Sequence, residues 1–399
     1  MLYLHSTEKL LGLKDVMIKN IEEKDGKTEI HMEMPVKPHT CPRCGECTRK
    51  VHDYRVQRIK DIPAFGKQTV LLLRKRRYRC SCGKCFYEKV HYLPRYYRMT
   101  NRFAAYVIDK LRTVCSFTSV AKEVGVSTPT VIRIFDIVQY GKPKLPEVLA
   151  IDEFKGNTGS EKYQCILTDP HNHVVLDILP KRCGSYLTTY FKPMNRSPVR
   201  FFVSDMWRTY TDFASTFFSD ATQIIDKYHF IRQVVWAFEV VRKEEQKKFN
   251  KSHRIYFKRS KTLLTKRFDY LTEEQKQQVN VMLYSSAKLS SSHFLKELFY
   301  RMLDANDKQT AKKLMSEWIM SSQNSDIPAF VSCSNTFINW SNGIMNSFDH
   351  PYTNGFTEGC NNKIKVLKRN AYGYRNFSRF RNRILHIFSH QNTKKMATA

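Results

Sequence analysis

Three acidic side chains that lie far apart in the chain stand where they could hold metal ions. Asp152 and Asp205 each end a short apolar run, and Glu358 lies early in a stretch with a helical pattern. A carboxylate at the carboxyl end of a core strand emerges at the edge of the sheet, where α/β proteins form their sites. Carboxylates suit Mg²⁺ (or Mn²⁺), and two such ions can drive an in-line displacement at phosphorus. We therefore expect Asp152, Asp205 and Glu358 to bind two ions.

Other interpretations of these acids stay open. An aspartate at a strand end is often only a turn or cap residue, so the three acids carry more weight together than singly. Asp226 competes with Asp205 for the second position, and we expect it beside the site, behind the carboxylates that bind metal. His229 is expected to be a packing histidine. Glu153 should point to the opposite face of its strand from Asp152.

The segment around Glu358 is basic. It contains ten Lys or Arg and no Asp or Glu from 359 to 399. On an α-helix, Glu358 shares one face with Asn361, Asn362, Lys365 and Arg369. Such a helix could hold a phosphodiester beside the metal ions, and we expect Lys365, Lys368 and Arg369 to contact DNA.

A sheet is needed to bring the acids together. Apolar runs predict five strands, at Val148–Asp152, Tyr163–Asp169, His173–Leu179, Arg200–Asp205 and Thr222–Asp226. Short helices are expected at Ser185–Lys192 and Tyr210–Phe218. If the first three strands form an antiparallel meander and a helix crosses to the fourth, the first and fourth strands are neighbours. The expected fold is an RNase-H-like α/β catalytic core with a mixed five-stranded sheet and helices.

Six of the 11 cysteines lie between Cys41 and Cys85, which indicates a metal site. Two knuckles at the ends of β-ribbons can supply four thiolates to a tetrahedral Zn²⁺. The predicted ligands are Cys41, Cys44 and Cys80, with either Cys82 or Cys85 as the fourth, and Cys47 is a bystander. The odd number of cysteines and the missing secretory signal disfavour a disulfide framework.

Residues 118–135 fit a helix-turn-helix. Gly125 makes the turn, Ser127 caps the second helix, and Pro129 is tolerated in its first turn. Residues Val131, Ile134 and Phe135 should face inward, which leaves Thr128, Thr130 and Arg133 for a DNA groove.

The cysteine region is also basic. Residues 41–100 contain 16 Lys or Arg against four Asp or Glu. We expect the run Arg74, Lys75, Arg76 and Arg77 to contact phosphates, because it lies beside a metal-stiffened hairpin with interleaved tyrosines.

The charge and hydrophobic content of the chain restrict the partners that it can have. The 399 residues include 67 Lys and Arg against 37 Asp and Glu, a formal net charge of +30, and 42% are hydrophobic. The chain can bury real cores, which excludes a disordered or low-complexity protein. It lacks the ~18 consecutive apolar residues of a membrane helix, and we expect no membrane partner. A basic folded chain of this kind favours nucleic acid in the cytoplasm.

Changes in residue composition and pattern divide the chain into regions. A turn is expected at Asp25-Gly26, and Gly141–Pro146 reads as a linker. We predict N-terminal strands and a zinc ribbon at 1–98, a helix-turn-helix domain at 99–140, and a catalytic domain at 147–390 with a helical insertion at about 237–345.

The order of these motifs and the residues within them resemble those of one protein family. Zinc ribbon and helix-turn-helix precede the segments Ile151–Phe154, Val203–Met206, Asp226–Phe230 and Asn354–Lys365, as in the ISL-three family of bacterial insertion-sequence transposases. The second knuckle departs from the pattern, with three cysteines where two are expected.

The resemblance implies that Asp152, Asp205 and Glu358 are a DDE triad. It also implies Mg²⁺-dependent cleavage at terminal inverted repeats, followed by strand transfer, in which the freed 3′-hydroxyl end is joined to target DNA. The partners would be double-stranded DNA and a second copy of the chain in a homodimer, in a bacterial, nucleoid-associated setting.

Two other classes of protein are weighed. The first is a non-enzymatic DNA-binding regulator on an inactivated transposase scaffold, which the intact acid triad disfavours. The second is an RNase-H-like structure-specific nuclease without strand transfer.

Overall fold

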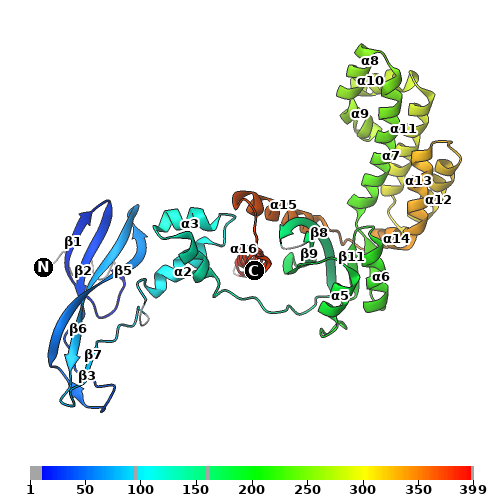
Figure 1. Cartoon of the computed structure of the whole chain (residues 1–399). Coiled ribbons are helices and arrows are strands. Elements are labelled where there is room, and N and C mark those ends of the chain that lie inside the picture. Colours follow the sequence, from blue (N-terminus) through cyan, green and yellow to red (C-terminus); the bar gives the residue numbers. More distant parts are fainter. Residues whose placement is uncertain (1–10, 94–96, 159–160, 397–399) are drawn as a thin grey trace. The chain divides into compact units, whose positions relative to one another are not determined.

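The computed structural model describes residues 11–93, 97–158 and 161–396, which form two compact units (Figure 1). The first unit comprises residues up to Tyr140 together with Val366–Gly373, and the second comprises Gly141–Lys365 with residues from Tyr374 onward. Residues 1–10 of the predicted N-terminal domain lie outside the described residues. No helix in the described ranges has the length and apolar character needed to cross a membrane.

The first unit begins with a twisted sheet. Its strands are β1 (Met17–Lys24), β2 (Lys27–Glu33), β5 (Val51–Ala64), β6 (Lys67–Arg79) and β7 (Cys85–Tyr87), in the order β1-β2-β6-β5 with β7 on β6. The predicted turn is present, because Asp25 and Gly26 both have positive φ angles between β1 and β2. A small ladder of β3 (His39–Thr40) and β4 (Cys47–Thr48) carries the first cysteine pair.

Three helices follow, α2 (Asn101–Lys110), α3 (Phe117–Val124) and α4 (Thr128–Phe135). Gly125 ends α3 at a φ of 66°, and the three residues predicted to face inward on α4 are buried. The predicted cap by Ser127 is wrong in detail. Ser127 occupies the N-cap position, but its hydroxyl bonds the Thr130 hydroxyl, because the Thr130 N–H already donates to the Ser127 carbonyl and Pro129 has no N–H.

The second unit contains the mixed sheet that the sequence predicts. Its strands are β8 (Val148–Thr158), β9 (Glu161–Asp169), β10 (Val174–Leu179), β11 (Phe201–Ser204) and β12 (Thr222–Ile225), in the order β10-β9-β8-β11-β12. The first three strands are an antiparallel meander, and β11 and β12 run parallel to β8. The first and fourth predicted strands are therefore neighbours, as expected.

Helices cover both faces of this sheet. On one face, α5 (Gly184–Phe191) and α6 (Arg208–Phe217) pack on a core that includes Ile151 and Phe202. The other face meets α15 (Gly355–Asn370), where the hydroxyls of Thr168 and Thr357 bond at 2.7 Å. The helix α16 (Phe377–Met396) follows a break in which Tyr372 and Gly373 have positive φ angles.

Asp152 does not end its strand, which corrects the prediction. Strand β8 continues to Thr158 because β9 pairs along it from Ala150 to Thr158, whereas β11 pairs only with Val148–Ala150. Asp152 therefore lies just beyond the end of the parallel pairing, on a longer antiparallel arm.

The helical region is an insertion between β12 and α15. Its helices, coloured green to orange in Figure 1, are α7 (Lys227–Lys248), α8 (Lys251–Arg259), α9 (Lys261–Thr265), α10 (Glu273–Tyr284), α11 (Ala287–Leu303), α12 (Lys308–Gln323), α13 (Pro328–Asn339) and α14 (Ser341–Asp349). Helix α14 covers the edge strand β12, where Asn346 donates to the Gln223 carbonyl at 2.8 Å. Gly343 permits this approach, because a Cβ there would lie 2.6 Å from Ile225.

The insertion core should depend on Trp318. Its indole is fully buried, lies 4.7 Å from the Phe337 ring between centroids, and donates to the Leu295 carbonyl at 3.0 Å. Trp318→Ala should destabilise the insertion by about 3–5 kcal/mol, through lost transfer energy and a residual cavity. Faster amide hydrogen exchange in α11 to α13 would report this loss. Met320→Ala, at a position on the same helix that is 61% exposed, should leave exchange unchanged, and slow exchange in both variants would contradict the assignment.

Candidate active site and metal centre

Three aspartates follow one another on adjacent strands of the second sheet. Asp152 lies on β8, Asp205 directly follows β11, and Asp226 directly follows β12. These strands are parallel, so the three residues lie at the same edge of the sheet, one strand spacing of ~4.8 Å apart. Asp152 and Asp226 are buried, with 7% and 2% of their surface exposed.

Helix α15 crosses this edge and is bonded at two points. The backbone N–H of Asn354, just before the helix, donates to Asp226 at 2.8 Å, and the Asn361 side-chain amide donates to Asp152 at 2.8 Å. The two residues are seven positions apart, a rise of ~10 Å on a helix, which matches two strand spacings. Glu358 lies between the two bonds along the chain, close enough for its charge to act on Asp152 and for that of Asp226 to act on it. The structure thus brings the three predicted acids to one edge.

The three carboxyls repel one another in a buried setting. Burial raises the pKa of Asp152 to about 7, and the negative charges of Asp205, Glu153 and Glu358 raise it further. Burial also raises the pKa values of Asp205 and Glu358, and His229 opposes the rise in both. A bound cation would remove this repulsion.

The residues around the acids fit divalent ions. Within the described part of the chain, four buried atoms near the acids have no hydrogen-bond partner: Asp226 Oδ2, His229 Nε2, Asn354 Nδ2 and Asn361 Oδ1. Buried polar atoms are normally satisfied, so these atoms have unmet bonding capacity of the kind that an ion or an ordered water satisfies. Among the described residues, the four cysteines of the predicted zinc site have ligand atoms within 4.8 Å of one another, whereas the three carboxylates do not. Two ions ~3.5–4 Å apart need ligands spread more widely.

Residues beyond the predicted set also shape the site. Glu153 lies on the opposite face from Asp152, as predicted, and accepts a 2.5 Å bond from Arg182. The guanidinium of Arg182 lies over the Tyr163 and Trp207 rings, 4.6 and 4.5 Å from their centroids. The backbone N–H of Trp207 in turn donates to the Asp205 carboxylate at 3.1 Å. No sequence spacing pointed to Arg182, because strand pairing and a loop bring it here.

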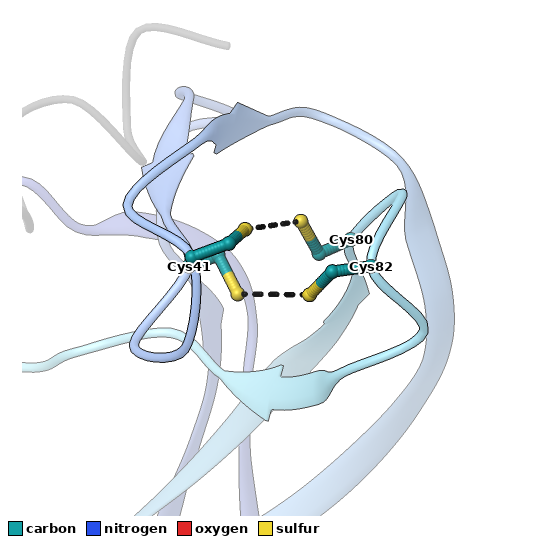
Figure 2. Close-up of side chains that lie close together, drawn as sticks. Cys41, Cys80 and Cys82 are labelled. Atoms are coloured by element: carbon teal, nitrogen blue, oxygen red, sulfur yellow. Dashed lines mark hydrogen bonds between the residues drawn. The ribbon is translucent and has the colours of Figure 1, made fainter.

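A cluster of four cysteines forms in the first unit. The sulfurs of Cys41, Cys44, Cys80 and Cys82 all lie within 4.8 Å of one another. The Cys41 and Cys82 sulfurs are 3.7 Å apart, and those of Cys44 and Cys80 are 3.4 Å apart. Figure 2 shows Cys41 on one side of the cluster with Cys80 and Cys82 facing it. A tetrahedron of sulfurs at ~2.3 Å from zinc has edges of ~3.8 Å, so the cluster fits this ion.

The environment of the cluster favours thiolate at Cys80 but not at Cys44. The Glu46 N–H lowers the pKa of Cys44, but hydrogen bonds with the other cysteines and burial together raise it to about 12. The Cys82 backbone N–H and the Ser81 hydroxyl lower the pKa of Cys80 to about 6. Of the two alternatives for the fourth position, Cys82 lies in the cluster, and Cys85 lies outside it at the start of β7. Cys47 also lies outside it.

One residue of the predicted DNA-binding set is wrong. Arg76 is 2% exposed, forms ion pairs with Glu33 and Glu88, and donates to the Met34 carbonyl, so it stabilises the first sheet. Arg74 lies two residues earlier on the same face of β6 but stays exposed. Arg76 is buried because Glu33, Glu88 and the Met34 carbonyl surround its guanidinium. The Arg74 guanidinium lies 3.9 Å from the Tyr54 ring centroid.

The other predicted DNA-binding residues keep some or all of their exposure. Arg133, Lys365 and Arg369 are exposed. The partly exposed ones are Lys75, Arg77, Thr128, Thr130 and Lys368.

Three family models match successive parts of the chain. One described as "zinc-finger of transposase IS204/IS1001/IS1096/IS1165" matches residues 37–85. One described as "Helix-turn-helix domain of transposase family ISL3" matches residues 88–136. The DDE model of the same family, described as "Transposase", matches residues 149–384, which is more than half of the chain.

Three relatives are similar to this chain over part or most of its length, and two of them are named as transposases. The chain is 28% identical to the "Transposase for insertion sequence element IS1001" of Bordetella parapertussis over 384 residues, covering 92% of this chain and 94% of that protein. It is 24% identical to the "Transposase for insertion sequence element IS1557" of Mycobacterium tuberculosis over 182 residues, covering 39% of this chain and 40% of that protein. A Lactococcus lactis protein named "ATP-dependent protease" is 32% identical over 136 residues, covering 34% of this chain and 39% of that protein. With the DDE model spanning both strand aspartates and Glu358, the chain belongs to the ISL3 family of insertion-sequence transposases.

Proposed function

We propose that this transposase binds the terminal inverted repeats of its element, cleaves DNA there with two Mg²⁺ (or Mn²⁺) ions, and joins the freed 3′-hydroxyl to target DNA. The observation that carries the proposal is the pair of bonds that holds α15 across Asp226 and Asp152, with Glu358 between them. The strand order and directions, a meander followed by two parallel strands, support an RNase-H-like catalytic core.

Each acid has a role in this proposal. Two divalent ions would activate the attacking oxygen and stabilise the leaving oxygen. Asp152, on the central strand, would contact both ions, and Asp205 and Glu358 would contact one each. Asn361 orients the Asp152 carboxylate through its 2.8 Å bond, and the Trp207 backbone N–H orients Asp205. Asp152 accepts at both oxygens, since the Glu153 backbone N–H donates to the other one at 2.7 Å. Each carboxylate oxygen has two lone pairs, so one hydrogen bond per oxygen leaves a lone pair for metal.

The first unit would hold the DNA. Zinc held by Cys41, Cys44, Cys80 and Cys82 would stiffen the ribbon, and α4 would present Thr128, Thr130 and Arg133 to a groove. Phosphates would meet the side chains of Arg74, Lys75, Arg77, Lys365, Lys368 and Arg369. Since transposition joins two ends, we propose a homodimer.

Alanine at Asp152, Asp205 or Glu358 should stop cleavage and leave end binding intact. Loss of several kcal/mol of metal-assisted stabilisation corresponds to about a 10³-fold or larger fall in rate. The measurement is cleavage of labelled element ends with Mg²⁺ or EDTA, paired with a gel shift. Asp212→Ala on α6, an exposed aspartate, is the matched control and should cleave normally.

The same assay separates the alternatives. Mg²⁺-dependent cleavage that survives all three substitutions would refute the triad. Binding without any cleavage by the wild type would favour a regulator. Cleavage without joining of supplied 3′-hydroxyl ends to target DNA would favour a nuclease.

The stability of the metal-free protein should depend on Asp152. Its pKa of about 7 lies above the ordinary 3.8, so the folded state keeps a proton that the unfolded state loses. Stability therefore falls as pH rises from about 4 to about 7, by at most about 4 kcal/mol from this group. In EDTA, Asp152→Asn should melt above the wild type at pH 8 and equal to it near pH 4.

Metal should reverse this difference. Adding Mg²⁺ at pH 8 should raise the melting temperature of the wild type and leave Asp152→Asn unchanged, because only the carboxylate binds the ion. Equal melting of both proteins at every pH, with and without metal, would count against a buried metal-binding carboxyl.

The zinc site should distinguish two neighbouring cysteines. Cys82→Ser should remove zinc and loosen the ribbon, whereas Cys85→Ser should keep about one zinc per chain, because only Cys82 lies in the cluster. Zinc content by a chromogenic chelator, after gel filtration, measures both. Full zinc in Cys82→Ser and loss in Cys85→Ser would reverse the assignment.

A further inference from the structure

One face of helix α7 carries large side chains that remain exposed. Tyr228, Trp236 and Val240 are 50%, 48% and 46% exposed, and Arg232 is exposed as well. These four positions recur every four residues, so they form one stripe along the helix, here called the α7 stripe. The helix packs into the insertion core through other residues, which include Phe230, Val234, Phe238 and Val241. The stripe is therefore not part of that core.

A cation and a ring are paired at the centre of the stripe. The guanidinium of Arg232 lies 4.1 Å from the centroid of the Trp236 ring. Such a cation–π contact orients the indole. Because Trp236 is still 48% exposed, its ring retains surface for a further planar group.

The stripe begins at the candidate active site. Asp226 is the N-cap of α7 and also accepts the Asn354 N–H that positions α15. Burial raises the pKa of Glu358, and the positive charge of Arg232 is among the charges that oppose the rise, so Arg232 lies within electrostatic range of Glu358. Trp236 follows Asp226 by ten residues, which is ~15 Å along the helix or about four base steps of DNA.

We propose that the α7 stripe holds an unpaired nucleotide of the DNA strand next to the cleavage point, with its base stacked on Trp236 and its phosphate on Arg232. This inference rests on the proposed function and adds a specificity surface to the same site. Every base offers a π face, and stacking on an exposed aromatic ring is available only to a base that has left the duplex stack. Arg232 supplies a planar donor fork that suits phosphate.

Charge argues against a second copy of the chain as the occupant. Two stripes meeting across a twofold axis would bring Arg232 against its own counterpart. Beyond Val240, Lys243 and Lys247 are exposed, and the next position of the stripe, Glu244, is an acid that accepts from Lys288 at 2.9 Å. With its net charge of +30, the chain as a whole is complementary to DNA.

The test uses the full-length protein and two element-end DNAs, one fully paired and one with 2-aminopurine as an unpaired nucleotide beside the end. In EDTA, the wild type should quench the 2-aminopurine fluorescence on binding. Trp236→Ala should lose the quench and bind the unpaired DNA about tenfold more weakly, the size expected for one lost base stack. Its binding to fully paired DNA should change less than about twofold. Trp236→Phe should keep most of the quench, and Arg232→Gln should weaken it.

The matched control is Tyr284→Ala, at an aromatic residue on α10 that is 96% exposed, which should behave as the wild type. Unchanged quenching and binding in Trp236→Ala would overturn the proposal. A change confined to oligomeric state, measured by light scattering, would also overturn it and assign the stripe to a protein interface. If the wild type fails to cleave with Mg²⁺ while quenching still depends on Trp236, the proposed function fails and the stacking site stands.

Discussion

The candidate active site depends on two hydrogen bonds that tie helix α15 to strands much earlier in the chain. Asn361 reaches Asp152 across 209 positions of sequence, and Asn354 reaches Asp226 across 128. Their spacing matches two strand intervals, so a single helix can satisfy both only in one register. That register places Glu358 beside the two strand aspartates. The insertion between β12 and α15 can be long because only its two ends need to meet the sheet.

The same arrangement places several carboxylates close enough to Asp152 to repel its charged form. Burial raises the pKa of each of the three acids, and neighbouring carboxylates add to the rise at Asp152. Several polar atoms around them are buried without partners among the described residues. Such a site is costly for an empty protein and favourable once cations neutralise it. The four-cysteine cluster also joins distant segments, since Cys41 and Cys82 are 41 positions apart and Cys44 and Cys80 are 36 apart. Its four sulfurs lie within 4.8 Å of one another, so it needs only one ion.

Local patterns predicted local structure well, and the errors have clear causes. The strands, the helix-turn-helix and the break before α16 follow from periodicity, from glycine at a positive φ, and from proline. Ser127 was placed correctly at the N-cap, but its hydroxyl found another partner. Arg76 was assigned to DNA from its neighbours in a basic run, although contacts with Glu33, Glu88 and the Met34 carbonyl bury it. Asp152 was expected at a strand end, but pairing with β9 lengthened β8.

The sequence by itself determined which residues could do chemistry, because carboxylates, paired cysteines and exposed cations are recognisable by type and spacing. It also favoured an antiparallel meander for the first three strands of the second sheet, since short connections favour pairing between consecutive strands. Only the tertiary structure decided that Cys82 rather than Cys85 joins the cluster, that Arg182 pairs with Glu153, and that Asn361 holds Asp152. These contacts join segments distant in sequence, and their geometry comes from the packing of strands and helices rather than from any local pattern.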